Sequence, residues 1–376
     1  MREPRAYIRY ARYAVQLAFV GLAAWIGVEC SRWAYALMTP GAVTIADRPA
    51  GVEAFLPIGG FMAVKYYVAT FIMDPARAIL DPFHPAGMFI FLSAIFVSAV
   101  ARKGFCGWIC PVGTLSEWLW KLGRKVMGSN RVMPPKADMG MKSIKYILAF
   151  TFVFFIMIMQ TGYIVLYFIS DYYRTVDVRM LLMFTDMSMV AAIAFSALAA
   201  LSVLYRNFWC RYLCPYGALT GVAAYLSPFR IRRNEEACIH CKACTRHCPS
   251  QIDVEAATEP ISTPECFGCL TCISPCPVGT NPSTGTGALD LATDKGKGSP
   301  MRNLIFYPAI VVAAFYLIIA LAMLSGNWQT RSPITEYERI VPGLIDPSLA
   351  PAETDTTGQT DSDWSPTRKY QPPTGE

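Results

Sequence analysis

Five apolar stretches do most to limit what this chain can fold into. They cover residues 13–34, 83–101, 146–169, 187–205 and 304–324. A helix needs about 20 apolar residues to cross the hydrocarbon core of a bilayer. Hydrophobic residues make up 54% of the chain and charged residues only 16%, which is too apolar for a soluble globular protein. The sequence therefore predicts a polytopic α-helical membrane protein with about five transmembrane helices.

Lysine and arginine residues are distributed unevenly among the segments that join these stretches. Residues 1–12, 102–145 and 206–303 carry 23 of them, whereas residues 29–82, 171–186 and 326–376 carry 10. Because cytoplasmic loops carry the excess of positive charge, we expect the first set, with the N-terminus, to be cytoplasmic and the C-terminus to be periplasmic. The net charge of +6 is then a topology signal, and no motif indicates nucleic-acid binding.

Residues 54–73 form a sixth apolar segment that contains Pro57, Gly59, Gly60 and Lys65. Counting this segment as a crossing would move every later loop to the other side of the membrane. We therefore expect a re-entrant or interfacial segment, with a spanning helix as the open alternative. The N-terminal apolar run lacks a small-residue cleavage site and is expected to be a retained helix.

The chain is expected to have four regions. They are a membrane domain at 1–228, a cysteine-rich domain at 229–290, a C-terminal transmembrane helix at 291–326 and a tail at 327–376. The tail is rich in Pro, Thr and Asp and shows no hydrophobic periodicity. Such a composition cannot offset the entropy of folding, so a disordered periplasmic tail is predicted.

The membrane domain contains an internal repeat. RKGFCGWICPVGTL at 102–115 and RNFWCRYLCPYGAL at 206–219 match at an offset of 104 residues. Each copy follows a helix expected to run from the outside to the inside. The two copies are therefore parallel repeats, with both motifs at the cytoplasmic interface.

Two runs of the form CxxCxxCxxxCP, at 238–249 and 266–277, are the most specific motif in the chain. Short loops let three thiolates reach three corners of one [4Fe–4S] cubane, while the chain carries the fourth to the other cubane. This predicts an inserted α+β domain of the bacterial 2[4Fe–4S] ferredoxin type, and paired zinc sites are the disfavoured alternative. The expected ligand sets are Cys238, Cys241, Cys244 and Cys276 for one cluster, and Cys248, Cys266, Cys269 and Cys272 for the other.

The two CxxxCP pairs, Cys106 with Cys110 and Cys210 with Cys214, form a second candidate site. If the segments are helical, each pair lies on one face, and the following proline ends the helix near the second cysteine. Three interpretations stay open. The four cysteines hold a third iron–sulfur cluster, they form redox dithiols or a soft-metal site, or they only pack. Two matching copies at one membrane depth favour a shared metal or redox site.

The remaining polar and sulfur residues carry weaker signals. Cys30 stands alone and is expected to pack in the core. Glu53, Asp81 and His84 are candidates for taking protons from a quinol, although polar residues at helix ends are an equally good interpretation. His240 and His247 lie within the cysteine runs and are expected at the surface. With so few histidines and no CxxCH, haem is not expected, and the lack of a glycine loop argues against NAD.

The twin CxxxCP motifs followed by the double-cluster runs resemble the NapH/NosR/CcoG type of membrane polyferredoxin, over residues 80–290. The resemblance is greatest to the NapH-like membrane component of a quinol dehydrogenase. It implies a bacterial cytoplasmic (inner) membrane location, ferredoxin clusters on the cytoplasmic side and a connection to the quinone pool. The chain departs from the family in lacking a periplasmic flavin domain and a strand-rich region, and in continuing past the ferredoxin runs.

Two functions are compatible with this resemblance. In the first, the chain is an iron–sulfur electron-transfer subunit between the quinone pool and a periplasmic or membrane redox partner, such as a respiratory reductase. In the second, it is a maturation factor that reduces a metal such as copper for assembly of another metalloenzyme. Fold-level analogy supports both, and the direction of electron flow is left open.

Overall fold

The computed structural model describes residues 3–75, 78, 80–278, 287–293 and 300–349. The chain divides into two units. The first unit comprises residues 1–24, 92–153 and 189–318, and the second comprises 25–91, 154–188 and 319–376. Four helices contribute residues to both units: α1 (Glu3–Ala36), α3 (Pro85–Val100), α5 (Pro135–Ile158) and α12 (Pro300–Leu324).

The other elements belong to one unit each. The first unit contains α4 (Pro111–Met127), α9 (Met189–Leu204), α10 (Pro215–Ala223), β1 (Phe229–Arg233), α11 (Ala243–His247) and β2 (Leu289–Thr293). The second contains α2 (Pro57–Met73), α6 (Thr161–Phe168), α7 (Asp171–Arg174), α8 (Val176–Thr185) and α13 (Ile334–Ile345). Short 3₁₀ turns cover Ile45–Asp47, Ala50–Phe55, Ala224–Leu226 and Pro347–Leu349.

The expected membrane architecture is present, although the count of five crossings is approximate. Within the described residues, three helices are long and apolar enough to span a bilayer: Ala6–Ala36, Pro135–Ile158 and Arg302–Leu324. The pair α8 and α9 makes a fourth if both helices belong to one broken span. Helices α2 and α3 are apolar but shorter than the usual span.

The predicted crossing at 146–169 is wrong in its bounds. Helix α5 ends at Ile158, and α6 begins at Thr161. Lys65 explains how the break is tolerated, because its ammonium donates to the carbonyls of Ile156 at 2.7 Å and Met157 at 3.1 Å, and also to that of Met159. The free carbonyls at the end of α5 are thus satisfied inside the second unit.

The segment at 54–73 is mostly one helix, α2, and its glycines do not interrupt it. Pro57 occupies the first helical position, where its missing N–H costs nothing. A Cβ on Gly60 would lie 2.6 Å from the carbonyl oxygen of Gly87, so glycine allows α2 and the start of α3 to approach closely. Whether α2 spans the membrane or lies at its interface stays a prediction.

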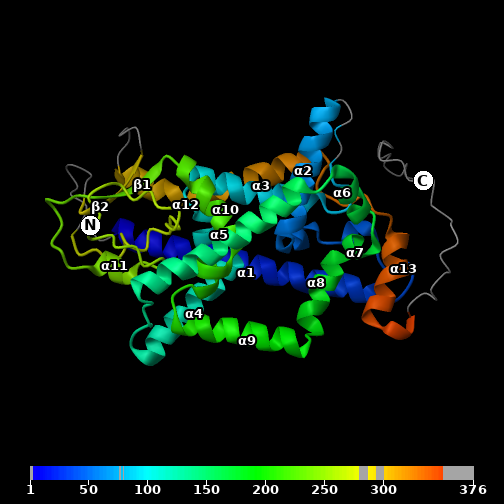
Figure 1. Cartoon of the computed structure of the whole chain (residues 1–376), viewed down its shortest axis with the longest axis horizontal. Coiled ribbons are helices and arrows are strands. Elements are labelled where there is room, and N and C mark those ends of the chain that lie inside the picture. Colours follow the sequence, from blue (N-terminus) through cyan, green and yellow to red (C-terminus); the bar gives the residue numbers. More distant parts are fainter. Residues whose placement is uncertain (1–2, 76–77, 79, 279–286, 294–299, 350–376) are drawn as a thin grey trace. The chain divides into compact units, whose positions relative to one another are not determined.

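The repeat is visible in the order of elements. In each copy an apolar helix (α3 or α9) leads to a short π-helical turn and then to a helix that begins at proline (α4 or α10). Helices α4 and α9 run side by side in the first unit (Figure 1). A Cβ on Gly123 of α4 would collide with the carbonyl of Val203 on α9, which is why this crossing needs glycine.

The cysteine-rich region folds as a small α+β module, as predicted. Its strands β1 and β2 pair antiparallel, with Phe229 opposite Thr293 and Arg233 opposite Leu289. Phe229 and Ile231 alternate toward the buried side of the strand. The expected domain boundary at residue 290 falls inside β2, which continues to Thr293.

The prediction that the whole tail is disordered is also wrong. Helix α13 buries Tyr337, Ile340 and Val341, which share one helical face by their spacing. The ring centroids of Tyr337 and Trp33 are 5.1 Å apart, inside a buried cluster that also includes Leu37. The rest of the predicted disordered segment, residues 350–376, lies outside the described residues.

Candidate metal centres

The two cysteine-rich loops share one backbone conformation. Counting from the first cysteine of each run, the third and fifth residues have left-handed φ angles. These are 55° at His240 and 57° at Lys242, and 59° at Gly268 and 56° at Leu270. Such a conformation costs a non-glycine residue about 1–2 kcal/mol. When residues with left-handed and right-handed φ angles alternate, successive backbone N–H groups point into one concavity, which binds anions such as iron–sulfur clusters.

The eight cysteines of these runs line two separate cavities in the first unit. One cavity is lined by Cys238, Cys241, Cys244 and Cys276, and the other by Cys248, Cys266, Cys269 and Cys272. In each cavity, three cysteines come from one run and the fourth comes from the other run. The structure thus brings together the same two groups of four that the spacing predicts.

The second of these cavities fits an iron–sulfur cluster chemically. The N–H of Ile252 donates to Cys248 Sγ at 3.4 Å, and the Thr271 hydroxyl donates to Cys269 Sγ at 3.2 Å. Burial raises the pKa of the Cys248 thiol to about 12, so a bound metal is needed to keep it deprotonated at neutral pH. Four sulfur ligands supported by such donors are what a cubane requires.

A single metal ion fits these residues less well. Within the described part of the chain, no three His, Cys, Asp or Glu side chains are placed to hold one ion. His240 Nδ1 lies 2.6 Å from Glu255, and His247 Nδ1 lies 2.8 Å from the carbonyl of Ala243. Both histidines therefore have partners of their own and do not complete a sulfur site.

Each CxxxCP pair lies at a π-helical turn, Phe105–Ile109 or Trp209–Leu213. The turn ends at the second cysteine, where ψ is 118° at Cys110 and 107° at Cys214, because the next residue is proline. The same cysteine caps the following helix, and Cys214 Sγ accepts a hydrogen bond from the Gly217 N–H at 3.3 Å. π-Helical turns occur often at functional sites, which suits a ligand position.

The four CxxxCP cysteines come together in the first unit. Burial, together with the charges of Cys106 and Cys214, raises the pKa of Cys110 to about 12. Burial also raises the pKa of Cys210, again with contributions from the other three cysteines. Sulfurs that influence one another in this way lie in one neighbourhood, so the two repeats can share a centre.

Lys103 lies beside these sulfurs and was missed by sequence reasoning. The residue is 1% exposed, and its ammonium has no hydrogen-bond partner within the described residues. It lies 5.0 Å from the ring centroid of Phe267, and its charge opposes the effect of burial on the pKa of Cys210 and Cys214. Glu265, which already pairs with Lys145, balances only part of this charge. An uncompensated buried charge costs several kcal/mol, so Lys103 indicates that further negative charge, such as cluster-bound thiolates, belongs here.

The CxxxCP centre packs directly on the second cysteine-rich loop. Cys210, Phe267 and Cys269 form one buried cluster, against which Cys106 and Trp209 also pack. The indole N–H of Trp108 donates to the carbonyl of Gly268 at 3.0 Å. The predicted third site and the second ferredoxin cavity are therefore adjacent.

The two repeats differ at the residue after the first cysteine. A Cβ on Gly107 would lie 2.7 Å from the carbonyl oxygen of Phe267, so only glycine lets the loop approach. The matching residue, Arg211, is buried and donates to Asp138 at 2.6 Å, as does the Tyr212 hydroxyl. At this position the ferredoxin loop packs against the first repeat, whereas α5 packs against the second.

Arg12 holds α1 against this junction and was read from sequence only as a topology signal. Its guanidinium donates to Glu117 on α4, to the carbonyl of Gly107 at 3.1 Å and to the Thr271 hydroxyl at 2.9 Å. Glu117 also accepts from Lys121 at 2.5 Å. An arginine near the start of a membrane helix gives no sequence signal for such a role.

The second unit brings Glu53, Asp81 and His84 together as a buried polar cluster. Arg48 donates to Glu53 at 2.9 Å and to Asp177 at 2.8 Å, with all three side chains inaccessible to solvent. The Tyr173 hydroxyl donates to Asp81 at 2.5 Å. The residues named from sequence are thus part of one network, and the isolated Cys30 is buried as expected.

His84 has partners in this network for both of its protonation states. Its Nε2 lies 2.7 Å from the carbonyl of Tyr173, while its Nδ1 lies 3.2 Å from Arg48 and 3.3 Å from Glu53. A neutral ring accepts from Arg48, and a protonated ring donates to Glu53. Burial lowers the pKa of His84, but the hydrogen bond and charge of Glu53 outweigh it, so the pKa is raised.

Comparison with known families supports this arrangement. A family described as a 4Fe-4S binding domain matches residues 83–130 and again residues 187–234, one match for each repeat. A family described as a 4Fe-4S dicluster domain matches residues 230–277, which include all eight cysteines of the two runs. No solved structure matches the chain.

Several curated proteins are similar to this chain. YccM of Escherichia coli K12, whose name provisionally assigns it to electron transport, is 36% identical over 88% of this chain and 89% of its own length. The regulatory protein NosR of Pseudomonas aeruginosa is 30% identical over 54% of this chain but 26% of its own length. The methylamine utilization ferredoxin-type protein MauN of Methylorubrum extorquens is 26% identical over 55% of this chain and 69% of its own length.

Proposed function

Because this chain belongs to the membrane-associated family of ferredoxin-type electron transport proteins, we propose that it passes electrons between membrane quinone and a redox partner protein. The eight cysteines of the two runs hold two [4Fe–4S] clusters, each bound by three cysteines of one run and one cysteine of the other. The CxxxCP cysteines hold a third iron–sulfur centre. Each cluster, when bound, accepts and donates one electron at a potential set by its surroundings.

One observation carries this proposal: the CxxxCP cysteines and the second cysteine-rich loop share a buried cluster of Cys210, Phe267 and Cys269. Adjacent centres make a continuous route for electrons inside the first unit. Lys103 supplies positive charge at the CxxxCP end of this route. The chain's own residues position and shield the centres, because Trp108 and Phe267 are both buried.

Oxidation of a quinol breaks two O–H bonds and releases two electrons and two protons. Bound clusters would take up the electrons one at a time, and the protons need acceptors. We assign His84 of the second unit as the acceptor of one proton, because its Nδ1 has Arg48 as donor when neutral and Glu53 as acceptor when protonated, and the other proton passes to water. A reduced partner that drives quinone reduction would use the same groups in reverse.

Iron analysis and quinol reduction test the proposal together. Because each cubane contains four irons, two clusters require about eight Fe per chain and a third raises this to about twelve. Anaerobic addition of a short-chain quinol to the oxidised holoprotein should produce the electron paramagnetic resonance signal of reduced clusters. His84→Gln should slow reduction by quinol while leaving reduction by dithionite unchanged. Clusters that exchange electrons with dithionite but with no quinol would refute the role of quinone.

Deletion separates electron transfer from metal-centre maturation. If the chain donates electrons, a strain without it should contain a fully loaded partner enzyme that is starved of electrons. If the chain is a maturation factor, the partner should lack its metal centre, and supplying electrons artificially should not restore activity.

A further inference from the structure

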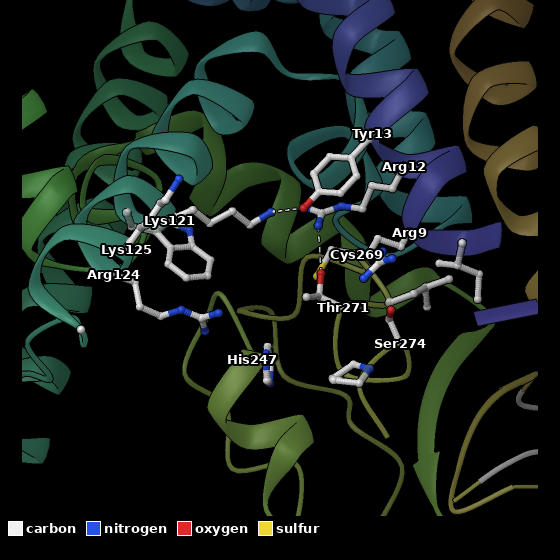
Figure 2. A pocket seen from close by; sticks show the side chains of 15 residues that line it. Arg9, Arg12, Tyr13, Lys121, Arg124, Lys125, His247, Cys269, Thr271 and Ser274 are labelled. Carbon is white, nitrogen blue, oxygen red and sulfur yellow. Dashed lines mark hydrogen bonds between the residues drawn. The ribbon is translucent and has the colours of Figure 1, made fainter. Parts of the chain in front are cut away.

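A large cavity beside the second ferredoxin site has no role in the proposed electron route. It has a volume of about 590 Å³ and lies within the first unit. Its walls come from the start of α1, the second half of α4, His247 of α11 and the loop that carries Cys269 (Figure 2). A volume of this size is typical of small-molecule sites. We call it the cationic pocket.

The charge of the cationic pocket is strongly one-sided. Five basic residues line it, and no Asp or Glu is among the described lining residues. The basic residues are Arg9, Arg12, Lys121, Arg124 and Lys125. Figure 2 shows Arg9 and Arg12 approaching the pocket from α1, while Lys121 and Arg124 approach from α4. Side chains from two helices therefore surround one volume.

Only part of this positive charge is neutralised by the protein. Glu117, which lies behind the wall, pairs with Arg12 and Lys121. Arg9, Arg124 and Lys125 form no ion pair within the described residues, and Arg124 lies 5.9 Å over the ring of Trp120. The carbonyl end of α4 offsets about half a charge. A cluster bound through Cys269, which also lines the pocket, would offset more.

The remaining lining adds apolar and aromatic surface. Ile8, Leu270 and Pro275 contribute apolar walls, and Tyr13 and Trp120 contribute rings. On the opposite side of α4 from the pocket-lining residues, Val112, Leu115, Leu122 and Val126 are exposed and share one face by their spacing. A basic helix face opposite an exposed apolar stripe is typical of a helix at the membrane interface.

We propose that the cationic pocket binds a phosphate-bearing anion, held by Arg9, Arg124 and Lys125 against the loop that carries Cys269. Arginine and lysine together are well suited to phosphate, through forked hydrogen bonds and a point charge. Two sources provide this chemistry. One is the headgroup of an anionic phospholipid from a bilayer on which the apolar face of α4 rests, and the other is a soluble phosphate compound.

Binding in this pocket would change the redox behaviour of the neighbouring cluster. Arg12 donates to the Thr271 hydroxyl at 2.9 Å, and Thr271 donates to Cys269 Sγ at 3.2 Å. Added negative charge here disfavours an extra electron on the cluster, so occupancy should lower its midpoint potential. This consequence rests on the proposed function, whereas the binding site does not.

Two phosphate probes test the site and identify the source. Native mass spectrometry of the holoprotein counts retained phosphatidylglycerol against phosphatidylcholine, and equilibrium dialysis measures inorganic phosphate. Selective retention of phosphatidylglycerol supports the lipid, and saturable binding of phosphate that no phosphatidylglycerol displaces supports the soluble compound. If neither probe binds, the proposal is wrong.

Paired variants locate the binding. Arg124→Gln/Lys125→Gln should weaken binding of the retained probe about tenfold for each charge removed. Arg131→Gln/Lys136→Gln removes the same charge outside the pocket and should leave binding unchanged. Equal loss in both variants would show nonspecific attraction and overturn the site. If the first variant loses its clusters, Arg9→Gln/Lys125→Gln replaces it, because both residues are exposed.

A redox titration with and without the retained probe completes the test. A lower midpoint potential in the presence of the probe supports the coupling through Thr271. Binding without a change in potential would overturn that coupling. Failure of quinol to reduce the clusters would count against the electron route alone, so the two proposals fail separately.

Discussion

Replacing Gly107 by alanine tests whether the CxxxCP centre and the ferredoxin loop depend on close contact. The added Cβ would lie 2.7 Å from the Phe267 carbonyl oxygen and 3.4 Å from Cys269 Cβ. Since ordinary contact begins at 3.4 Å, the loop must move away by about 0.7 Å. The obstacle is backbone, which cannot rotate aside as a side chain can. Overpacking of this kind costs about 1–3 kcal/mol.

Thermal loss of the visible cluster absorbance is the assay for this variant, because the displaced loop carries cluster ligands. Gly107→Ala should lower the midpoint of that loss and broaden the resonance signal of the nearest cluster. Gly140→Ala is the matched control. An added Cβ on Gly140, inside α5, would have no atom within 4 Å, so alanine there should stabilise the folded protein by about 0.5–1 kcal/mol. Equal midpoints for the two variants would refute the close contact.

Three further predictions concern charged side chains. Arg12→Met should destabilise the protein by about 3 kcal/mol in chemical denaturation. This is the lower end of the range for a broken buried ion pair, because Lys121 still neutralises Glu117. The double variant Arg12→Met/Glu117→Met should recover part of the lost stability. Lys65→Met should cost about 1–3 kcal/mol by leaving carbonyls at the end of α5 unsatisfied, and an unchanged unfolding midpoint would contradict this. Because the pKa of His84 is raised, its stabilisation is complete below pH 6.5 and is lost as the pH rises through the folded-state value. The thermal unfolding midpoint of the wild type should thus fall as the pH is raised from 6 to 8. A His84→Gln variant whose midpoint falls equally with pH would exclude His84 as the cause.

The grouping of the eight ferredoxin cysteines could be predicted because their spacing is local. Three sulfurs separated by two residues reach one cubane whatever surrounds them, and the fourth must belong to the other set. The same reasoning located the break at each CxxxCP motif, since the residue before a proline avoids the α conformation. In both cases a short segment of backbone determines the geometry.

The electrostatic environment of the site could not be predicted, because it comes from residues far apart in sequence. Arg12 meets Glu117 on α4 and Thr271 in the cysteine-rich loop. Lys103 lies just before the first CxxxCP motif, where the sequence indicates only a basic residue of a cytoplasmic loop. Sequence gives the sign of such charges, but only the packing shows whether they face water, lipid or a buried anion.

The helical periodicity of α13 is hidden when the composition of residues 327–376 is considered as a whole. Residues 327–376 taken together look disordered, because the part outside the described residues dominates the composition. Yet Tyr337, Ile340 and Val341 repeat at helical spacing and pack near Trp33 and Leu37 of the same unit. A window of 12 residues, the length of α13, would have revealed the pattern. The free energy of burying one aromatic and two aliphatic side chains, about 1.5–3 kcal/mol each, is enough to order such a short helix once a partner surface exists.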